Sequence, residues 1–335
     1  MTQPVVSETN PSVEVGHPQS HVSSRDTRPQ QAPRQIVLVR PHRFTPNPLT
    51  ELDNRFQSRP TQDPRQVARV AFEEVTSLAE KLEKLGLGVA VFEDLTNETP
   101  DSVFPNNWFS THDDGTVVLY PMHAPNRRAE RREDVLAHLR KSGVVRRVVD
   151  YSTAESEGQY LEGTGAMVLD HVHRLAYVCR SQRASSHLLA RFCSDLGFQP
   201  VVFDAFDSRG VPVYHTNVLM SVGTHVTLIG ATMIRDPRQR ARVLDSLRST
   251  GRQVIELEES QIQRFAGNCL EVSAVGGPTL VLSATAASSL TPQQRRAISV
   301  HAHLEPVDVS MIESAGGSVR CMMAGNHLPP RQSKP

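Results

Sequence analysis

Hydrophobic residues recur along this chain with two alternating periods. In five stretches they stand three or four residues apart, which is the spacing of one face of a helix. Pro64 opens the first stretch, where proline suits a first helical turn, and Gly197 follows the third, where glycine commonly ends a helix. We therefore predict helices over residues 63–84, 128–141, 184–196, 237–249 and 292–301.

Short runs of β-branched and aromatic residues lie between these helices and predict strands. One run follows each helix, at residues 89–92, 144–149, 201–203, 254–257 and 307–309. A hairpin precedes four of the helices, at residues 108–120, 166–179, 218–229 and 270–282. In the first hairpin, Asp113-Asp114-Gly115 is a strong turn signal. The fifth hairpin is split between the two ends of the chain, with one strand at residues 35–40 and the other at residues 319–324.

The pattern amounts to five β-β-α-β units that follow one another at intervals of about 55 residues. Sustained repetition of this kind is typical of propellers and solenoids, and a split first unit indicates a closed ring, because closure removes exposed sheet edges. We predict an α/β fold, a five-bladed pseudo-fivefold propeller of ββαβ units. The alternative is an ordinary α/β sandwich whose helices are evenly spaced.

The first 33 residues differ from the rest of the chain. They are rich in Ser, Pro, Gln and Thr, poor in large apolar residues, and lack the apolar core of a secretory signal. We expect a disordered tail over residues 1–33 and a single catalytic propeller domain over residues 34–332.

Charge and cysteine content exclude several classes of partner. The chain carries 36 Lys and Arg against 36 Asp and Glu, so there is no electrostatic case for nucleic acid or an anionic membrane. No apolar run approaches the ~20 residues that span a bilayer. The four cysteines are widely separated and lack the spacing of a zinc site, so we expect free thiols in a reducing cytoplasm.

Polar motifs recur at one phase of the predicted units, just before or inside the first hairpin strand. They are Phe104-Pro-Asn-Asn-Trp-Phe109, Tyr160-Leu-Glu-Gly-Thr-Gly165, Tyr214-His-Thr-Asn217, Gly267-Asn-Cys269 and Arg320-Cys321. If the units surround an axis, these positions face a common centre. The sequence therefore predicts a central pocket with the groups that covalent hydrolysis requires, namely a nucleophile, a proton carrier, a carboxylate and two amides. These are Cys321, His215, Glu162, Asn107 and Asn217.

Cys321 is the predicted nucleophile. It follows Gly316-Gly317, where the backbone turns or approaches closely, and the neighbouring Arg320 favours the reactive thiolate. Arg320 alternatively packs its stem against the next blade, and Cys269 suits packing better than chemistry. The histidine, the carboxylate and the two asparagines each also suit a purely structural role. All of them occupy equivalent positions in successive units, and this favours a functional role.

Four motifs resemble the amidinotransferase/arginine deiminase superfamily, and most closely its citrulline utilization hydrolase branch. They are Phe104-Pro-Asn-Asn-Trp-Phe109, Leu161-Glu-Gly163, His215-Thr-Asn217 and Gly316-Gly-Ser-Val-Arg-Cys-Met322, and the resemblance runs from about residue 35 to residue 331. It implies a five-bladed α/β propeller, the pentein fold. It also implies that Cys321 attacks a guanidino or ureido carbon, that His215 shuttles protons, and that Glu162 binds a substrate nitrogen and orients the histidine.

Two asparagines depart from the pattern of the arginine deiminases, which carry aspartate at the positions of Asn107 and Asn217. Carboxylates suit a guanidinium cation, which only donates hydrogen bonds. Carboxamides suit a neutral ureido group, which donates through N–H and accepts through C=O. We therefore expect a citrulline-like substrate, because leaving a buried cation without its counter-charges costs several kcal/mol.

The expected reaction is hydrolysis of citrulline to ornithine, CO2 and ammonia through a covalent Cys321 intermediate, without a metal or an organic cofactor. The partner is a small ureido or guanidino amino acid, whose head group we expect Arg40 and Asn47 to bind at the mouth of the pocket. Whether the chain forms a homo-oligomer is left open. Three alternatives also remain: a deiminase of arginine or methylated arginine, an amidinotransferase, and a catalytically inactive propeller that acts as a binding module.

Overall fold

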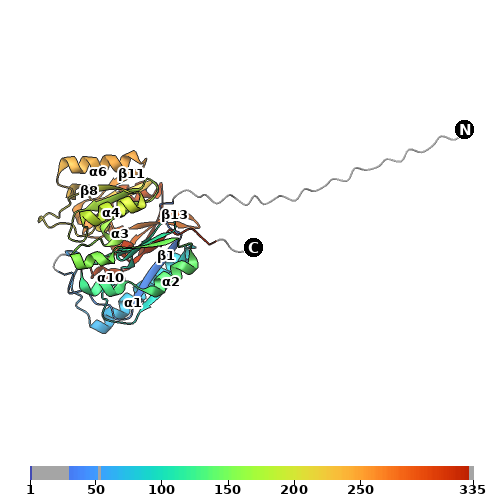
Figure 1. Cartoon of the computed structure of the whole chain (residues 1–335). Coiled ribbons are helices and arrows are strands. Elements are labelled where there is room, and N and C mark those ends of the chain that lie inside the picture. Colours follow the sequence, from blue (N-terminus) through green and yellow to red (C-terminus); the bar gives the residue numbers. More distant parts are fainter. Residues whose placement is uncertain (2–29, 52–53, 332–335) are drawn as a thin grey trace.

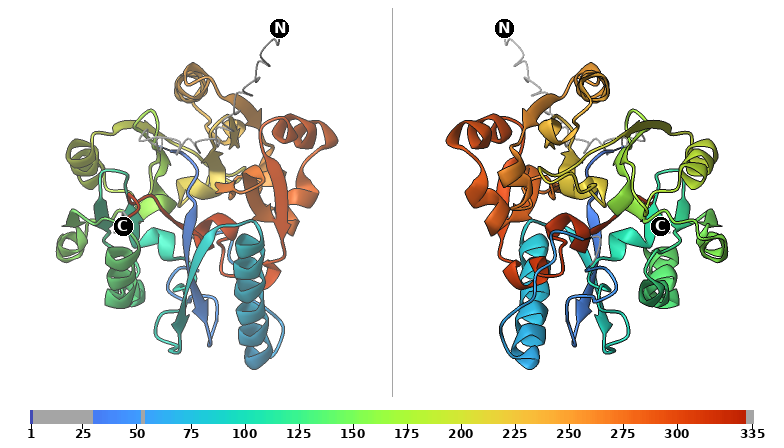
Figure 2. Two further views of the ribbon diagram at one scale, coloured as in Figure 1. Left: turned by 90° about the vertical axis from the view of Figure 1, so that its right-hand side faces the viewer. Right: turned by 90° about the vertical axis from the view of Figure 1, so that its left-hand side faces the viewer.

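A computed structural model describes Met1 and residues 30–51 and 54–331 of the chain. Five three-stranded sheets surround a common centre, and the long helices lie on the outside (Figures 1 and 2). In each sheet the middle strand pairs antiparallel with one neighbour and parallel with the other. The prediction of an α/β propeller built from five ββαβ units is therefore confirmed.

The first two units contain β15 (Ala324–Asn326), β1 (Gln35–Pro41), α1 (Pro64–Lys84) and β2 (Gly88–Asp94), then β3 (Phe109–Thr111), β4 (Thr116–Leu119), α2 (Glu133–Ser142) and β5 (Arg147–Asp150). The third and fourth contain β6 (Val168–Asp170), β7 (Leu175–Cys179), α4 (Ser186–Leu196) and β8 (Gln199–Phe203), then β9 (Met220–Val222), β10 (Val226–Ile229), α6 (Pro237–Ser249) and β11 (Gln253–Glu256). The fifth contains β12 (Leu270–Ala274), β13 (Gly277–Ser283), α8 (Ala284–Ser289), α9 (Pro292–Ser299) and β14 (His303–Val307).

Local sequence signals set the ends of several outer helices. Asp63 accepts a hydrogen bond from the Arg65 N–H at the start of α1, and Ser185 does the same for Leu188 at the start of α4. Gly197 ends α4 in the left-handed conformation, with φ of 71°. The predicted helix over residues 128–141 instead divides into η2 (Pro125–Glu130) and α2.

The ring closes where the two ends of the chain meet. β1 pairs with β15 in antiparallel register, with Ile36 opposite Gly325, as the split hairpin predicted. The closing strand is shorter than expected, however, because Val319–Met322 forms the single helical turn α11. In this turn the N–H groups of Cys321 and Met322 both donate to the carbonyl of Ser318.

Similar short turns lead into the first strands of other units. They are η1 (Pro105–Asn107), α3 (Gly163–Ala166) and α5 (Thr216–Leu219), and α11 is the fourth. η1 contacts both α3 and α11, and α3 contacts α5, so the turns gather at the centre of the ring. The remaining connections contain η3 (Ser152–Glu157), η4 (Ala231–Met233), α7 (Glu259–Ile262) and α10 (Ser310–Glu313).

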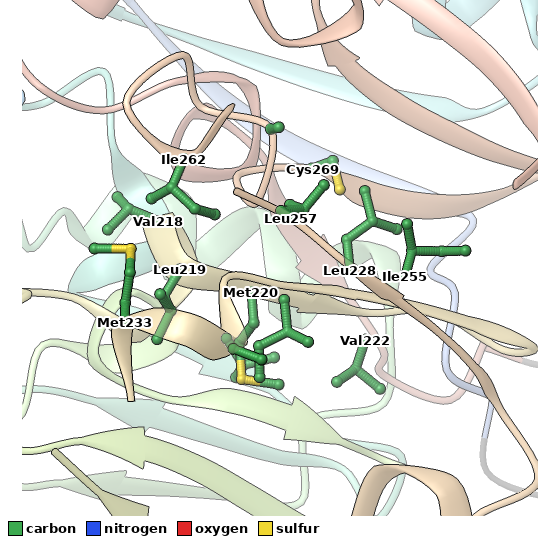
Figure 3. Packing of buried hydrophobic residues seen from close by; sticks show 14 of the residues in the cluster. Val218, Leu219, Met220, Val222, Leu228, Met233, Ile255, Leu257, Ile262 and Cys269 are labelled. Atoms are coloured by element: carbon green, nitrogen blue, oxygen red, sulfur yellow. The ribbon is translucent and has the colours of Figure 1, made fainter. Parts of the chain in front are cut away.

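The hydrophobic core consists of separate clusters between sheets and their outer helices. Figure 3 shows one of them, in which Leu219, Leu228 and Ile255 pack together beside Cys269. The packed structure begins earlier than residue 34, because Gln31 and Ala32 are buried. Residues 2–29, most of the predicted tail, lie outside the described residues. None of the helices in the described ranges is both long and apolar enough to cross a membrane.

Candidate active site

Cys321 lies in α11 at the centre of the ring and is only 2% exposed. Two carboxamides donate hydrogen bonds to its Sγ atom, from Nδ2 of Asn217 at 3.3 Å and from Nδ2 of Asn268 at 3.2 Å. Asn268 also donates to the backbone carbonyl of Asn217 and accepts from the N–H of Arg320. The thiol is therefore held by N–H donors, which favour a sulfur that carries negative charge.

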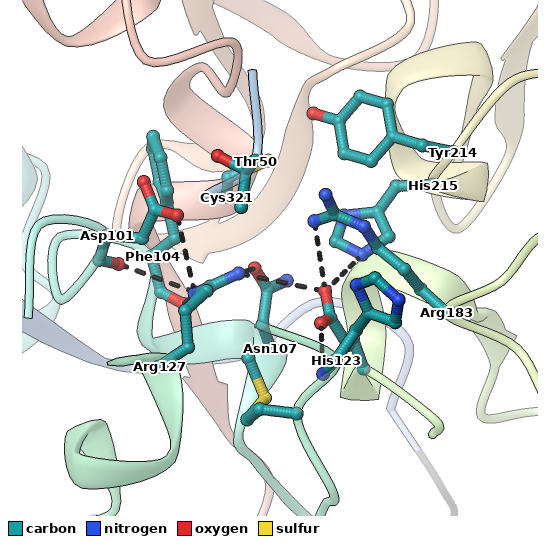
Figure 4. Close-up of polar contacts among 12 residues, drawn as sticks. Thr50, Asp101, Phe104, Asn107, His123, Arg127, Arg183, Tyr214, His215 and Cys321 are labelled. Carbon is teal, nitrogen blue, oxygen red and sulfur yellow. Dashed lines mark hydrogen bonds and ion pairs between the residues drawn. The ribbon is translucent and has the colours of Figure 1, made fainter. Parts of the chain in front are cut away.

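A histidine and a carboxylate form the second part of the site (Figure 4). His215 Nε2 lies 2.8 Å from Oε2 of Glu162, whose side chain is completely buried. Arg183 Nη1 lies 3.3 Å from the same oxygen, and the backbone N–H of His123 donates to Oε1 at 2.9 Å. Burial alone raises the pKa of Glu162, but Arg183, His215 and Arg127 together lower it well below its usual range. Glu162 is therefore an anion at neutral pH.

His215 carries no charge at neutral pH. Burial lowers its pKa to about 4, although the hydrogen bond to Glu162 opposes that shift. His215 and Cys321 line the same cavity. A neutral imidazole in this place can take the proton from a thiol, and the Glu162 carboxylate then stabilises the imidazolium that forms.

Asn107 is fixed beside this pair by a buried arginine. Its Oδ1 atom accepts a hydrogen bond from Arg127 Nη1 at 2.9 Å, and its Nδ2 atom donates to Asn106. Gly165 makes room for the arrangement, because a Cβ atom there would collide with Asn107 Nδ2 and lie 2.8 Å from His215 Nδ1. The glycine-rich segment after Glu162 therefore lets two site residues approach each other.

Charged groups line the part of the cavity next to Asn107. Asp101 accepts from Asn47 Nδ2 at 2.8 Å and lies 3.6 Å from Arg127 Nε, while Glu130 accepts two hydrogen bonds from Arg127. Burial raises the pKa of Asp101, against the effect of Arg127 and Asn47.

Two buried acceptors in this region lack partners within the described part of the chain. They are Oδ1 of Asp101 and Oδ1 of Asn217, and Asn217 already donates to Cys321 through its amide nitrogen. Because buried polar atoms are normally hydrogen-bonded, these two oxygens are natural contact points for N–H groups of a ligand. Asp101 and Cys321, the partner of Asn217, both belong to the lining of one small cavity, which consists of Thr50, Asn54, Asp101, Phe104, Asn107, Arg127, Arg183, Tyr214, His215, Ala315, Gly317 and Cys321.

Five of the six predicted site residues come together at this centre. The sixth, Arg40, does not line the cavity and is paired elsewhere, so its expected contact with the substrate head group stays a prediction. Arg40 on β1 stands opposite Glu93 on β2, and its Nε atom lies 3.2 Å from both carboxylate oxygens. Its guanidinium also stacks on Phe72 and donates to Thr76. A cross-strand ion pair thus holds Arg40 away from the centre.

The sequence analysis missed four polar residues of the site. Arg127, Arg183 and Asp101 stand outside the repeated motifs, and no local pattern marks them. Asn268 belongs to the Gly267-Asn-Cys269 motif, but that motif drew attention for its cysteine. Cys269 instead packs against Ser221, and burial raises the pKa of its thiol to about 12. Within residues 30–51 and 54–331, no group of three or more His, Cys, Asp or Glu is arranged to hold a metal ion.

Comparison with known proteins finds one family model and several solved structures of similar fold. A family model described as N,N dimethylarginine dimethylhydrolase, eukaryotic, matches residues 40–328. No curated protein matches. Among solved structures, the N-terminal domain of ArgZ, an arginine dihydrolase of cyanobacteria, is 15% identical with a TM-score of 0.66, over 88% of this chain and 98% of that one.

Two further structures show the same architecture. Unliganded AgrE is 17% identical with a TM-score of 0.66, over 89% of this chain and 40% of its own. A dimethylarginine dimethylaminohydrolase adduct with S-methyl-L-thiocitrulline is 16% identical with a TM-score of 0.60, over 88% and 99%. At these identities the likeness concerns the fold, and this chain spans only 41% of full-length ArgZ.

Proposed function

Because the chain belongs to the N,N-dimethylarginine dimethylhydrolase family, within the amidinotransferase/pentein superfamily, we propose that it is a cysteine-dependent hydrolase of an arginine-type amino acid. The bond that breaks joins nitrogen to the terminal guanidino or ureido carbon. The observation that carries this proposal is the convergence of the Cys321 thiol and the neutral His215 at one buried cavity, with the Glu162 carboxylate hydrogen-bonded to His215 behind it.

The reaction proceeds in two steps on Cys321. His215 takes the thiol proton, the thiolate adds to the terminal carbon, and His215 returns the proton to the departing nitrogen. Water then attacks the S-bound carbon, with His215 again accepting a proton, and the thiol is released. Asn217 and Asn268 stabilise the thiolate in both steps, because each donates an N–H to sulfur.

The charged groups of the cavity suit a zwitterionic head group. Asp101 offers a buried oxygen without a partner to an ammonium group, and Arg127 and Arg183 lie in the same cavity as cations for a carboxylate. This set takes the role that the sequence analysis assigned to Arg40.

At the reacting end the uncharged carboxamides support a neutral ureido group, which makes citrulline the first candidate substrate. Asn107, Asn217 and Asn268 are carboxamides, and the one carboxylate, Glu162, already contacts Arg183 and His215. The unpaired Oδ1 of Asn217 can accept an N–H from a ureido or a guanidino group, but as a neutral amide it supplies no counter-charge to a guanidinium. Loss of the alkyl amine from citrulline yields ornithine and carbamate, and carbamate decays to CO2 and ammonia.

The second candidate is a guanidino substrate, arginine or methylated arginine. The family match and the similarity to arginine-processing enzymes favour this candidate over citrulline. The unpaired carboxylate oxygen of Asp101 adds negative charge to the same cavity. In this case the first step releases ammonia or an alkylamine and produces citrulline.

One experiment separates the two candidates. Purified protein is incubated with citrulline, arginine or dimethylarginine in buffer without an amine acceptor, and ornithine, citrulline, amines and ammonia are quantified beside Cys321→Ala. Ornithine from citrulline, lost in the variant, supports the ureido hydrolase. Citrulline from arginine or dimethylarginine supports the guanidino hydrolase. Product that forms only after an amine is added indicates an amidinotransferase, and turnover that survives in Cys321→Ala contradicts the proposal.

A further inference from the structure

A second cavity, here called the axial cavity, lies along the innermost strands of the ring. All five innermost strands contribute to it, because its lining includes residues of β3, β6, β9, β12 and β15. Its wall is formed by Gln31, Pro33, Phe109, Ser110, Thr111, Thr164, Val168, Leu169, His171, Met220, Ser221, Val222, Cys269, Leu270, Arg320, Ala324, Gly325 and His327. None of these residues lines the cavity that contains Cys321, so the two spaces are distinct.

Among the described residues, the lining of the axial cavity contains one cation and no carboxylate. Arg320 is the only Lys, Arg, Asp or Glu that this part of the chain contributes to the wall. The Arg320 guanidinium donates one hydrogen bond, to the carbonyl of Met323 at 3.1 Å, and forms no ion pair with any carboxylate in the described ranges. Burial lowers the pKa of Arg320 to about 10, but the group still carries its charge at neutral pH. Arg320 is half-buried, and a partly desolvated guanidinium without a carboxylate partner suits an anion.

Two histidines add neutral hydrogen-bond donors to the same wall. The rings of His171 and His327 stack with centroids 4.0 Å apart. Burial lowers the pKa of His327 to about 4 and that of His171 well below its usual value, and the charge of Arg320 contributes to both shifts. Neutral imidazoles each retain one N–H donor, so they add no second formal charge.

The N-terminal part of the domain is built into this wall. Gln31 donates from Nε2 to the carbonyls of Leu169 and Val222, both at 2.9 Å, and accepts from the N–H of His171 at 2.9 Å. The side chain therefore bridges two neighbouring units and fixes the backbone beside His171. The geometry of the wall is thus set by hydrogen bonds within the fold.

We propose that the axial cavity binds one monovalent inorganic anion, held by the guanidinium of Arg320 beside the stacked rings of His171 and His327. A single fixed cation matches a single negative charge, and the small space between the inner strands suits an ion of the size of chloride, bromide or nitrate. The anion lies behind the nucleophile, because Arg320 and Cys321 are neighbours in α11. This inference does not depend on which substrate the enzyme takes.

The test measures thermal unfolding of the full chain in sodium chloride, bromide and nitrate against sodium gluconate at equal ionic strength. The small anions should raise the midpoint by roughly 3 °C in a saturable manner, whereas gluconate is too large to enter. Arg320→Met should lose this dependence, and without small anions it should unfold no earlier than the wild type. Arg296→Met is the matched control, because Arg296 is exposed on α9 and should keep the full anion effect.

Crystals of the wild-type protein grown in bromide give a readout that needs no variant. An anomalous peak beside the Arg320 guanidinium supports the proposal. A wild-type midpoint that is the same in all four salts, together with no such peak, overturns it, as does an undiminished anion effect in Arg320→Met. If Arg320→Met does not fold, two other results test the proposal. We expect the bromide peak in the wild-type crystal, and we expect small anions to raise the unfolding midpoint less in His327→Phe than in the wild type.

Discussion

Asn268 holds the nucleophile through a single N–H group, and its replacement gives a sharp test of the site. Its Nδ2 atom donates to Cys321 Sγ at 3.2 Å, while its Oδ1 atom accepts from the N–H of Arg320 at 3.0 Å. Asn268→Asp preserves the shape of the side chain and the acceptor for Arg320. It replaces the Nδ2 donor by an oxygen, so it removes the hydrogen bond to sulfur and also the one to the carbonyl of Asn217, and both losses disfavour the thiolate.

The size of the effect follows from the kind of hydrogen bond that is lost. A hydrogen bond to a charged group contributes about 1.5–3 kcal/mol, and each 1.4 kcal/mol corresponds to a factor of ten. Asn217 still donates to sulfur, so the thiolate keeps one of its two donors. We expect the rate at which iodoacetamide alkylates Cys321 at neutral pH to fall by roughly 10- to 100-fold, and its pH profile to move toward higher pH.

The assay follows the Cys321 peptide by mass spectrometry as a function of pH, and circular dichroism verifies that each variant is folded. Asn326→Asp is the matched control, because Asn326, at the end of β15, donates to Gln35 rather than to the thiol. The reasoning is refuted if Asn268→Asp is folded and Cys321 is alkylated at the wild-type rate across the whole pH range.

Three further predictions concern space, recognition and stability. Gly165→Ala should reduce turnover by about 100-fold or more, because the new Cβ atom displaces Asn107 and His215. Gly276→Ala is the control, since Gly276 has open space around it and the change should leave turnover unchanged. Equal activity of the two variants would contradict the prediction. Asp101→Asn should raise KM by roughly 10- to 100-fold with a smaller change in kcat, since the substrate ammonium loses its counter-charge. Steady-state kinetics measure both constants, and a change in kcat alone would contradict the role of Asp101 in binding the ammonium group. Burial raises the pKa of Glu74 from 4.5 to about 7, although it accepts from the backbone N–H groups of α10. The folded state therefore binds this proton more tightly than the unfolded chain. The contribution of protonated Glu74 to the free energy of unfolding is complete below pH 4.5, and about 3 kcal/mol of it is lost as the pH rises to about 7. Urea unfolding should show this loss in the wild type relative to Glu74→Gln, and a difference that does not vary with pH would exclude it.

Local patterns were sufficient to predict the repeating architecture. Strand and helix periods, the proline in the first turn of α1 and the glycine that ends α4 depend on neighbours within a few residues, so they can be seen in sequence alone. The helical turn at Cys321 was predicted as strand, because the apolar run of Val319–Met322 is too short for its period to distinguish the two.

Some residues of the site could likewise be predicted from the sequence, and others only from the tertiary structure. By itself the sequence determined the five-unit ring and the residues that the repeat brings to its centre, among them Cys321, His215 and Glu162, because equivalent positions in equivalent units face one axis. Only the tertiary structure decided which charged side chains reach that centre. Arg127 and Arg183 extend into the cavity from the connections between the middle strand and the helix of their units, while Arg40 is held by Glu93 on the neighbouring strand. A long charged side chain goes where its counter-charge and its burial allow, and both depend on segments far apart in the chain.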